Sequence, residues 1–185
     1  MKLYFMTELS NNNVQWYAAR VKYQTEKKIK TWFETMKIEH FIPFKTVVIE
    51  YKGRKRKKEK PIVPCIIFVH TTYSTAISLP IESGYSMNYI RNIETKKIQV
   101  IPDKQMEDCR FLFTLSDKTF KVCNANLRRG DRVRVTRGPF MGIEGELVRL
   151  KGHKRVVVRL EGVFSLVTTY IPEDFLERVE EKSNE

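Results

Sequence analysis

The chain has 185 residues, of which 42% are hydrophobic and 30% charged, and its formal net charge at pH 7 is +12. This length allows one large domain or two small ones. No apolar run reaches the roughly 18–20 residues of a membrane-spanning helix, and no signal peptide precedes the first polar cluster. The three cysteines, Cys65, Cys109 and Cys123, lack a Cys-x-x-Cys spacing, which argues against a disulfide framework or a zinc site and predicts a cytoplasmic protein.

The positive charge is concentrated in the first part of the chain. Residues 1–110 carry 20 lysines and arginines against 11 acidic residues, a net charge of +9. Residues 111–185 carry 14 against 11, a net charge of +3. Such a bias predicts a polyanionic partner for the first part, with nucleic acid as the first candidate and an anionic membrane surface as the second.

The first elements alternate between strand and helix. Residues 1–13 end in a polar cluster and are expected to form a loose leader. Residues 14–21 predict a strand, and residues 25–37 predict a helix. The helix has a 3.6-residue apolar stripe, formed by Ile29, Trp32, Phe33 and Met36. Residues 40–51 are rich in β-branched and aromatic side chains and predict a long strand, with Pro43 near its start.

A strongly basic segment follows, with seven cations among residues 52–60. Because like charges repel, we predict a solvated hairpin tip there. Its charge density favours contact with the phosphates of a nucleic acid, although a solvated loop without a ligand is the alternative. The candidate nucleic-acid-binding residues in this segment are Arg54, Lys55, Arg56, Lys57 and Lys58.

The remaining elements of the first part lead to a linker. Residues 61–69 form a nearly continuous apolar run, typical of a central strand buried on both faces. A short helix is expected at 73–79, a strand at 85–90 and a last helix at 103–115. Residues 116–128 are expected to be the linker.

The last part predicts short strands joined by turns. Val133 and Val135 alternate with polar residues, which is typical of a half-buried strand. The following glycines and proline suit a tight turn, with Phe140 folded back onto the core. Further strands are expected at 146–150, 155–160 and 165–171, and a closing segment at 172–179.

The sequence of residues 130–145, Gly-Asp-x-Val-x-Val-x-x-Gly-Pro-Phe-x-Gly-x-x-Gly, resembles a KOW motif. This motif marks small SH3-like barrels in transcription elongation factors and in some ribosomal proteins. Its turn residues are Gly130, Gly138, Pro139, Phe140, Gly142 and Gly145. The turn by itself also explains the glycines, and a KOW barrel alone specifies no partner.

From about residue 15 to residue 179, the chain resembles the NusG family of transcription elongation factors. The resemblance rests on Trp16-Tyr17, residues 41–44, the basic segment, Pro61-x-x-Pro64-x-x-x-Phe68-Val69 and the KOW motif, in that order. It implies an α/β N-terminal domain at 14–115, with an antiparallel sheet flanked by helices. The linker and a C-terminal SH3-like β-barrel at 129–185 would follow.

Two departures from the general factor resemble the specialised RfaH-type and UpxY antiterminators of capsular polysaccharide loci. General members carry Pro-Gly-Tyr where this chain has Pro64-Cys65-Ile66. They also place an aromatic residue near Glu161, in the barrel loop that contacts Rho or a ribosomal protein. A carboxylate buried there would be costly. We therefore expect weak or absent Rho binding, and a ribosomal protein remains a candidate partner.

The resemblance implies an apolar hollow that grips the clamp helices of RNA polymerase. The matching positions are Val63, Ile66, Phe68, Met106 and Cys109. From the sequence alone, an ordinary core role is the alternative for each of them. Lys22 matches a basic position that lies near nontemplate DNA in RfaH-type proteins.

Trp32 lies at the edge of its helical stripe, beside Lys28. A half-exposed indole there can stack on an unpaired base, worth roughly 1–3 kcal/mol. The alternative is that the ring seals the rim of the core. DNA and nascent leader RNA are both candidate ligands.

No enzyme signature is present. His40, His70 and His153 are far apart in the chain, and there is no phosphate-cradling glycine loop. We expect no cofactor, no metal, no membrane partner and a monomeric chain. The favoured function is a non-catalytic, locus-specific antitermination factor that rides on RNA polymerase. The alternatives are a general elongation factor that couples polymerase to Rho or the ribosome, and a ribosome-associated RNA-binding protein.

Overall fold

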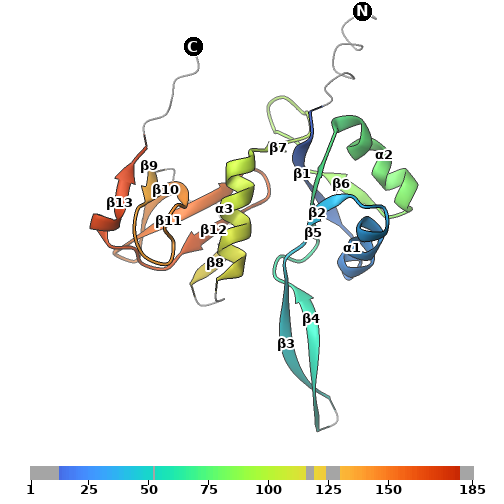
Figure 1. Ribbon diagram of the computed structural model, residues 1–185, viewed down its shortest axis with the longest axis horizontal. Helices are drawn as coiled ribbons and strands as arrows, with labels where there is room; N and C mark the ends of the chain where they lie inside the picture. The colour runs from blue at the N-terminus through green and yellow to red at the C-terminus, as the bar shows by residue number, and fades with distance from the viewer. Residues whose placement is uncertain (1–12, 52, 116–118, 124–129, 180–185) are drawn as a thin grey trace, which may run out of the picture. The chain divides into compact units, whose positions relative to one another are not determined.

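A computed structural model describes residues 13–51, 53–115, 119–123 and 130–179 (Figure 1). The chain divides into two compact units, residues 1–100 and residues 101–185. The predicted leader, apart from Asn13, and most of the predicted linker lie outside the described residues. The expected α/β first half and all-β last half of the chain are confirmed.

The first unit is built on an antiparallel sheet with the strand order β2-β5-β1-β6. These strands are β2 (Glu39–Phe41), β5 (Ile66–Thr71), β1 (Gln15–Val21) and β6 (Met87–Tyr89). The apolar run predicted as a central strand is confirmed from Ile66 onward, because β5 lies between β2 and β1. The start of that run, Pro61, instead ends another strand, and residues 62–65 form a turn.

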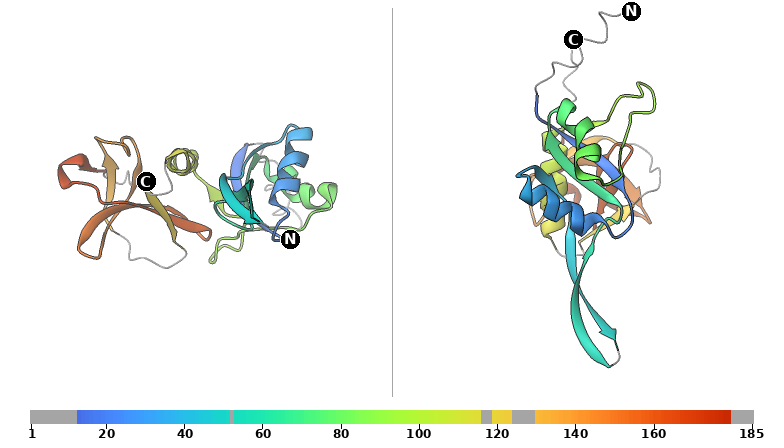
Figure 2. Two further views of the ribbon diagram at one scale, coloured as in Figure 1. Left: turned by 90° about the horizontal axis from the view of Figure 1, so that it is seen from below. Right: turned by 90° about the vertical axis from the view of Figure 1, so that its right-hand side faces the viewer.

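Two helices, α1 (Glu26–Thr35) and α2 (Tyr73–Ser83), pack on one face of this sheet (Figure 2). The predicted stripe of α1 supplies Ile29 and Phe33 to the core, whereas Met36 is 50% exposed. Burial of apolar surface between the helices and the sheet stabilises this unit. The buried cluster consists of Tyr17, Ala19, Val21, Ile29, Phe33, Ile42, Ile67, Val69, Ala76, Leu79, Met87 and Ile98.

The strand predicted at 40–51 is two strands. After β2 the chain leaves the sheet at Ile42 and Pro43, and it resumes as β3 (Phe44–Tyr51). Proline has no backbone N–H to donate to a ladder, so it ends the pairing with β5. The Pro43 carbonyl instead accepts a 2.8 Å hydrogen bond from the backbone N–H of Ile62.

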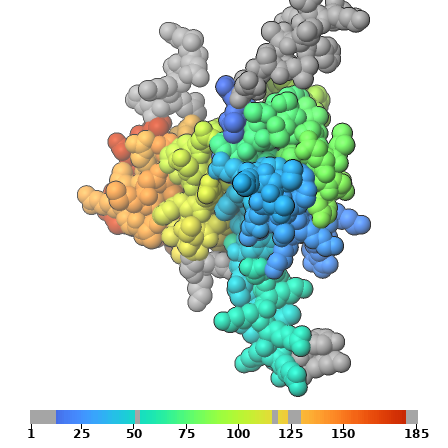
Figure 3. All heavy atoms as spheres, turned by 45° about the vertical axis from the view of Figure 1, so that its right-hand side comes forward, coloured from blue at the N-terminus to red at the C-terminus, as the bar shows by residue number. Residues whose placement is uncertain are grey.

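The predicted basic tip is wrong in extent, because the basic residues themselves form a strand. β4 (Arg54–Pro61) pairs with β3 along its whole length. The resulting two-stranded hairpin projects from the rest of its unit (Figures 1 and 3). Alternate side chains of a strand point to opposite faces, which separates neighbouring cations while the backbone stays hydrogen-bonded. The expected solvation is confirmed, since residues 54–60 are all exposed.

The second unit contains helix α3 (Asp103–Thr114), preceded at the unit boundary by β7 (Val100–Ile101). Its antiparallel sheet has the order β13-β9-β10-β11-β12-β8. The strands are β8 (Phe120–Cys123), β9 (Arg132–Val135), β10 (Glu144–Leu150), β11 (His153–Leu160), β12 (Phe164–Thr168) and β13 (Leu176–Arg178).

Two features of this unit differ from the sequence-based expectations. Strand β8 lies inside the expected linker; it pairs with β12 and buries Phe120. The closing segment contains a 3-10 turn, Glu173–Phe175, before β13 pairs with β9.

The helix predicted at 103–115 is confirmed as α3, and it belongs to the same compact unit as the barrel strands. The domain boundary expected after residue 115 stays a prediction.

Candidate functional site

Three residues of the predicted polymerase hollow lie in the first unit. Ile67 and Val69 belong to the core beneath α1 and α2, so the alternation of β5 directs Ile66 and Phe68 to the opposite face of the sheet. Phe68 pairs there with Ala18 of β1 and with Phe41 of β2, with 6.2 Å between the Phe41 and Phe68 ring centroids. Val63 lies in the turn before β5. All three predicted side chains are buried.

The other two residues of the predicted hollow, Met106 and Cys109, lie on α3 and are also buried. The helix contacts the barrel through Phe113, whose ring meets Phe120 at a centroid distance of 5.4 Å and Phe164 at 6.3 Å. Burial raises the pKa of the Cys109 thiol, so it remains protonated and unreactive at neutral pH. The use of these residues as a contact surface stays a prediction.

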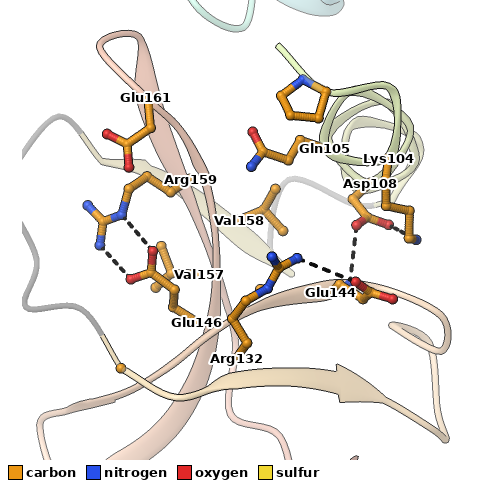
Figure 4. Close-up of a pocket in the computed structure, with 13 residues that line it drawn as sticks. Lys104, Gln105, Asp108, Arg132, Glu144, Glu146, Val157, Val158, Arg159 and Glu161 are labelled. Carbon is orange, nitrogen blue, oxygen red and sulfur yellow. Dashed lines mark hydrogen bonds and ion pairs between the residues drawn. The ribbon is translucent and has the colours of Figure 1, made fainter. Parts of the chain in front are cut away.

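A polar clasp also joins α3 to the barrel (Figure 4). The Asp108 carboxylate accepts a 3.2 Å hydrogen bond from the backbone N–H of Glu144, and a 2.7 Å bond from Nζ of Lys104. Lys104 also donates to the Gly142 carbonyl at 3.0 Å. The Lys104–Asp108 spacing of i, i+4 is visible in the sequence, but the barrel partners lie more than 30 residues away.

Beside this clasp lies a cavity of about 270 Å³ whose charged lining residues are paired. Arg159 donates to both carboxylate oxygens of Glu146, at 3.1 and 3.0 Å, and this hydrogen bonding raises the pKa of the guanidinium. Arg132 lies 3.5 Å from Glu144. In the described ranges, no group of three or more His, Cys, Asp or Glu side chains is placed to hold a metal ion.

Asp108 is expected to make the unfolding free energy depend on pH. Burial raises the pKa of this carboxyl, against the opposing effect of its hydrogen bonds. A folded-state pKa above the ordinary value of about 3.9 means that the folded chain binds the proton more tightly. The resulting stabilisation is full below the unfolded pKa and is lost as the pH rises through the folded pKa.

We therefore expect the unfolding free energy of the wild type, relative to Asp108→Asn, to fall as the pH is raised from about 4 towards 7. Denaturant titrations of both proteins, followed by circular dichroism at several pH values, measure this difference. Parallel profiles would contradict the assignment.

The predicted nucleic-acid residues are distributed over three elements of the first unit. Lys22, just after β1, and Lys28, on α1, are exposed. Trp32 is half-buried, packs against the core cluster and contacts the Phe33 ring at a centroid distance of 5.6 Å. The contact of Trp32 with the core agrees with the alternative that the ring seals the rim of the core. Because the ring is still partly exposed, base stacking stays a prediction. The five basic residues at 54–58 all lie on β4.

The turn before β5 depends on Glu26, which the sequence analysis did not single out. Cys65 adopts a left-handed backbone conformation with φ of 62°. Its N–H donates to Oε1 of Glu26 at 2.8 Å, and its carbonyl accepts from the N–H of Val21 at 3.0 Å. Glu26 is only 2% exposed and begins α1. An acidic residue in the first turn of a helix was the available sequence signal.

Because a side chain at positive φ costs of order 1–3 kcal/mol, Cys65→Gly is expected to stabilise the first unit. The gain should be roughly 1 kcal/mol, since glycine also gains freedom in the unfolded chain. Cys65→Val should destabilise it. Thermal unfolding of the three proteins measures the order, and a glycine variant that is less stable than the wild type would refute this account.

The KOW residues have structural roles in the β9–β10 hairpin. Gly138 and Gly142 have φ of 80° and 90°, and Gly142 donates its N–H to the Val135 carbonyl. A Cβ atom at Gly130 would lie 1.8 Å from the Leu147 carbonyl oxygen, which only glycine avoids. Phe140 is buried, as predicted, whereas Pro139 is exposed.

Two family models match parts of the chain. Residues 14–110 match the family model described as "Transcription termination factor nusG", and residues 129–159 match the KOW motif. One similar solved structure, "Domain interaction in Thermotoga maritima NusG", is 19% identical with a TM-score of 0.46. The match covers 91% of this chain and 98% of that one. No curated protein matches. Among the described helices, none is both long and apolar enough to cross a membrane.

Proposed function

The chain belongs to the NusG family of non-catalytic transcription factors, and we propose that it is a locus-specific antitermination factor. The family generally binds RNA polymerase, and its members act in transcription elongation and termination. In the proposed mechanism, the chain binds the polymerase clamp helices, holds the clamp closed and suppresses pausing or termination. The observation that supports the polymerase-binding part of this proposal is the NusG match over residues 14–110.

The proposed polymerase contacts are two apolar groups, one in each unit. In the first unit they are Ile66 and Phe68, on the face of the sheet opposite α1 and α2, and Val63 in the turn before β5. In the second unit they are Met106 and Cys109 of α3. Apolar side chains of this size can each contribute about 1.5–3 kcal/mol when they are removed from water. Because all five are buried, the proposal requires that they become accessible before polymerase binds.

The proposed nucleic-acid contacts use the exposed cations of the first unit. Cations of the β3–β4 hairpin, together with the exposed Lys22 and Lys28, would touch upstream or nontemplate DNA, or nascent leader RNA. Trp32 would stack on an unpaired base. Such contacts explain why the charge excess lies within residues 1–110, because phosphate neutralisation requires clustered lysines and arginines.

The specialised subtype is supported by the composition of two loops. Cys65 adopts a left-handed backbone conformation, at the position where the resemblance implies a glycine in the general factor. Glu161 is exposed in the β11–β12 turn, close enough to Arg159 to raise the pKa of that guanidinium. A carboxylate there disfavours an apolar barrel partner. We therefore propose weak Rho binding, with a ribosomal protein as a further candidate partner.

Affinity purification of the tagged chain, combined with ribosome sedimentation, tests this function. The proposal expects RNA polymerase to co-purify and the deletion strain to lose transcripts only downstream of pause or termination sites in one or a few operons. Genome-wide changes would favour the general elongation factor. Sedimentation with ribosomes, without polymerase, would favour the ribosome-associated alternative.

A further inference from the structure

The β3–β4 hairpin separates its charges between two faces. Direct cross-strand partners share a face, so Lys45 lies with Lys60, Val47 with Lys58 and Ile49 with Arg56. Arg54 continues this face beside the turn. We call these residues the cationic face: its five charged residues, Lys45, Arg54, Arg56, Lys58 and Lys60, are all basic.

The opposite face carries charges of both signs. Thr46 lies opposite Glu59, Val48 opposite Lys57 and Glu50 opposite Lys55. We call this the mixed face: the charges of its two lysines and two glutamates sum to zero. Glu59 also forms a 2.9 Å ion pair with Lys27 of α1, and this contact lowers the Glu59 pKa. The mixed face is therefore turned towards the helix at the root of the hairpin.

The aliphatic side chains of the cationic face are more buried than that of the mixed face. Val47 and Ile49 are half-buried, whereas Val48 on the mixed face is 62% exposed. Their direct partners are Lys58 and Arg56, whose aliphatic stems can lie over the branched side chains while the charged groups stay in water. Along β4 the cations of this face form a row, with about 6.6 Å between successive side chains on one face of a strand.

We propose that the cationic face binds the phosphate backbone of duplex DNA, while the mixed face does not contact it. The inference rests on the proposed function only in taking nucleic acid as the ligand. A two-stranded ribbon fits the B-DNA major groove, which is about 12 Å wide. With eight residues in each strand, the hairpin extends about 26 Å and can follow a row of phosphates. The A-form RNA major groove is too deep and narrow for it.

A pair of matched double variants tests the proposal in the full-length chain. Arg56→Ser/Lys58→Ser changes the cationic face, and Lys55→Ser/Lys57→Ser changes the mixed face. All four residues are exposed neighbours on β4, and each variant removes two positive charges. Substitutions at exposed positions should change the unfolding free energy by less than about 0.5 kcal/mol, which thermal unfolding checks.

Fluorescence anisotropy with a mixed-sequence DNA duplex of about 30 base pairs, titrated at several NaCl concentrations, gives the affinity and its salt dependence. We expect the cationic-face variant to bind about ten-fold more weakly at low salt. The slope of log affinity against log salt should shrink by about 1.8, or 0.9 for each lost phosphate contact. The mixed-face variant should change the slope by less than about 0.5.

Equal losses in the two variants would overturn the proposal, because they would show that only the total charge matters. Tighter binding of a matched RNA duplex would overturn the assignment to DNA. Absence of duplex binding by the wild type would overturn the face assignment altogether. Polymerase co-purification is measured without added DNA, so failure of the proposed function remains distinguishable from each of these outcomes.

Discussion

Ile66→Glu is expected to remove the association with RNA polymerase while leaving the first unit folded. Ile66 lies on the face of β5 opposite α1 and α2, where the proposal places the polymerase contact. The proposal requires this face to become accessible before polymerase binds, so a carboxylate at Ile66 can reach water without entering the core cluster beneath α1 and α2. In the complex it would lie against an apolar partner, which costs several kcal/mol for an unpaired charge.

Ile67→Glu is the matched control, because it places the same charge one residue along the same strand. Ile67 is fully buried in the cluster beneath α1 and α2. An uncompensated carboxylate fixed there should destabilise the unit by at least about 3 kcal/mol. Circular dichroism and polymerase co-purification of both variants measure the contrast. If Ile66→Glu unfolds like Ile67→Glu, both faces are structural core; if it folds and still binds polymerase, the surface assignment is wrong.

Gly145→Ala is expected to destabilise the barrel strongly. A Cβ atom at this position would lie 2.5 Å from the Val157 carbonyl oxygen and 2.7 Å from Cγ1 of Val156. Gly145 pairs with Val133, and its neighbour Glu146 pairs with Val157, so the backbone cannot shift without disrupting ladders on both sides of β10. Overpacking against backbone in this setting should cost about 3 kcal/mol. That corresponds to a decrease of more than 10 °C in the melting temperature of a domain of roughly this size.

Gly152→Ala provides the control for this prediction. Gly152 has a positive φ, of 80°, whereas Gly145 does not, and a Cβ atom at Gly152 would meet nothing within 4 Å. Gly152→Ala should therefore cost only the strain of an alanine at positive φ, which lowers the unfolding free energy by roughly 1–2 kcal/mol. Thermal unfolding of the two variants compares steric and conformational costs in one barrel. Equal melting temperatures would mean that β10 and β11 separate freely at Gly145, contrary to the structure.

Local patterns in the sequence predict the elements whose geometry depends on near neighbours. The helical stripe of Ile29 and Phe33 identified the buried side of α1, because residues three and four apart share a helix face. The KOW glycines predicted the β9–β10 turn, since positive φ values at Gly138 and Gly142 are a local backbone requirement. The family resemblance rests on the KOW motif and on short motifs between Trp16 and Val69, together with their order along the chain.

The sequence by itself therefore determined the two-part architecture, the KOW hairpin and the excess of basic residues in the first half of the chain. Only the tertiary structure decided that the basic segment is a strand, whose alternate cations share a face, and the pairing register with β3 then places Lys45 on the cationic face. It also decided the roles of Asp108 and Glu26, whose partners lie 36 and 39 residues away. Burial and long-range hydrogen bonding arise when distant segments pack together, and no local periodicity encodes which segments will meet.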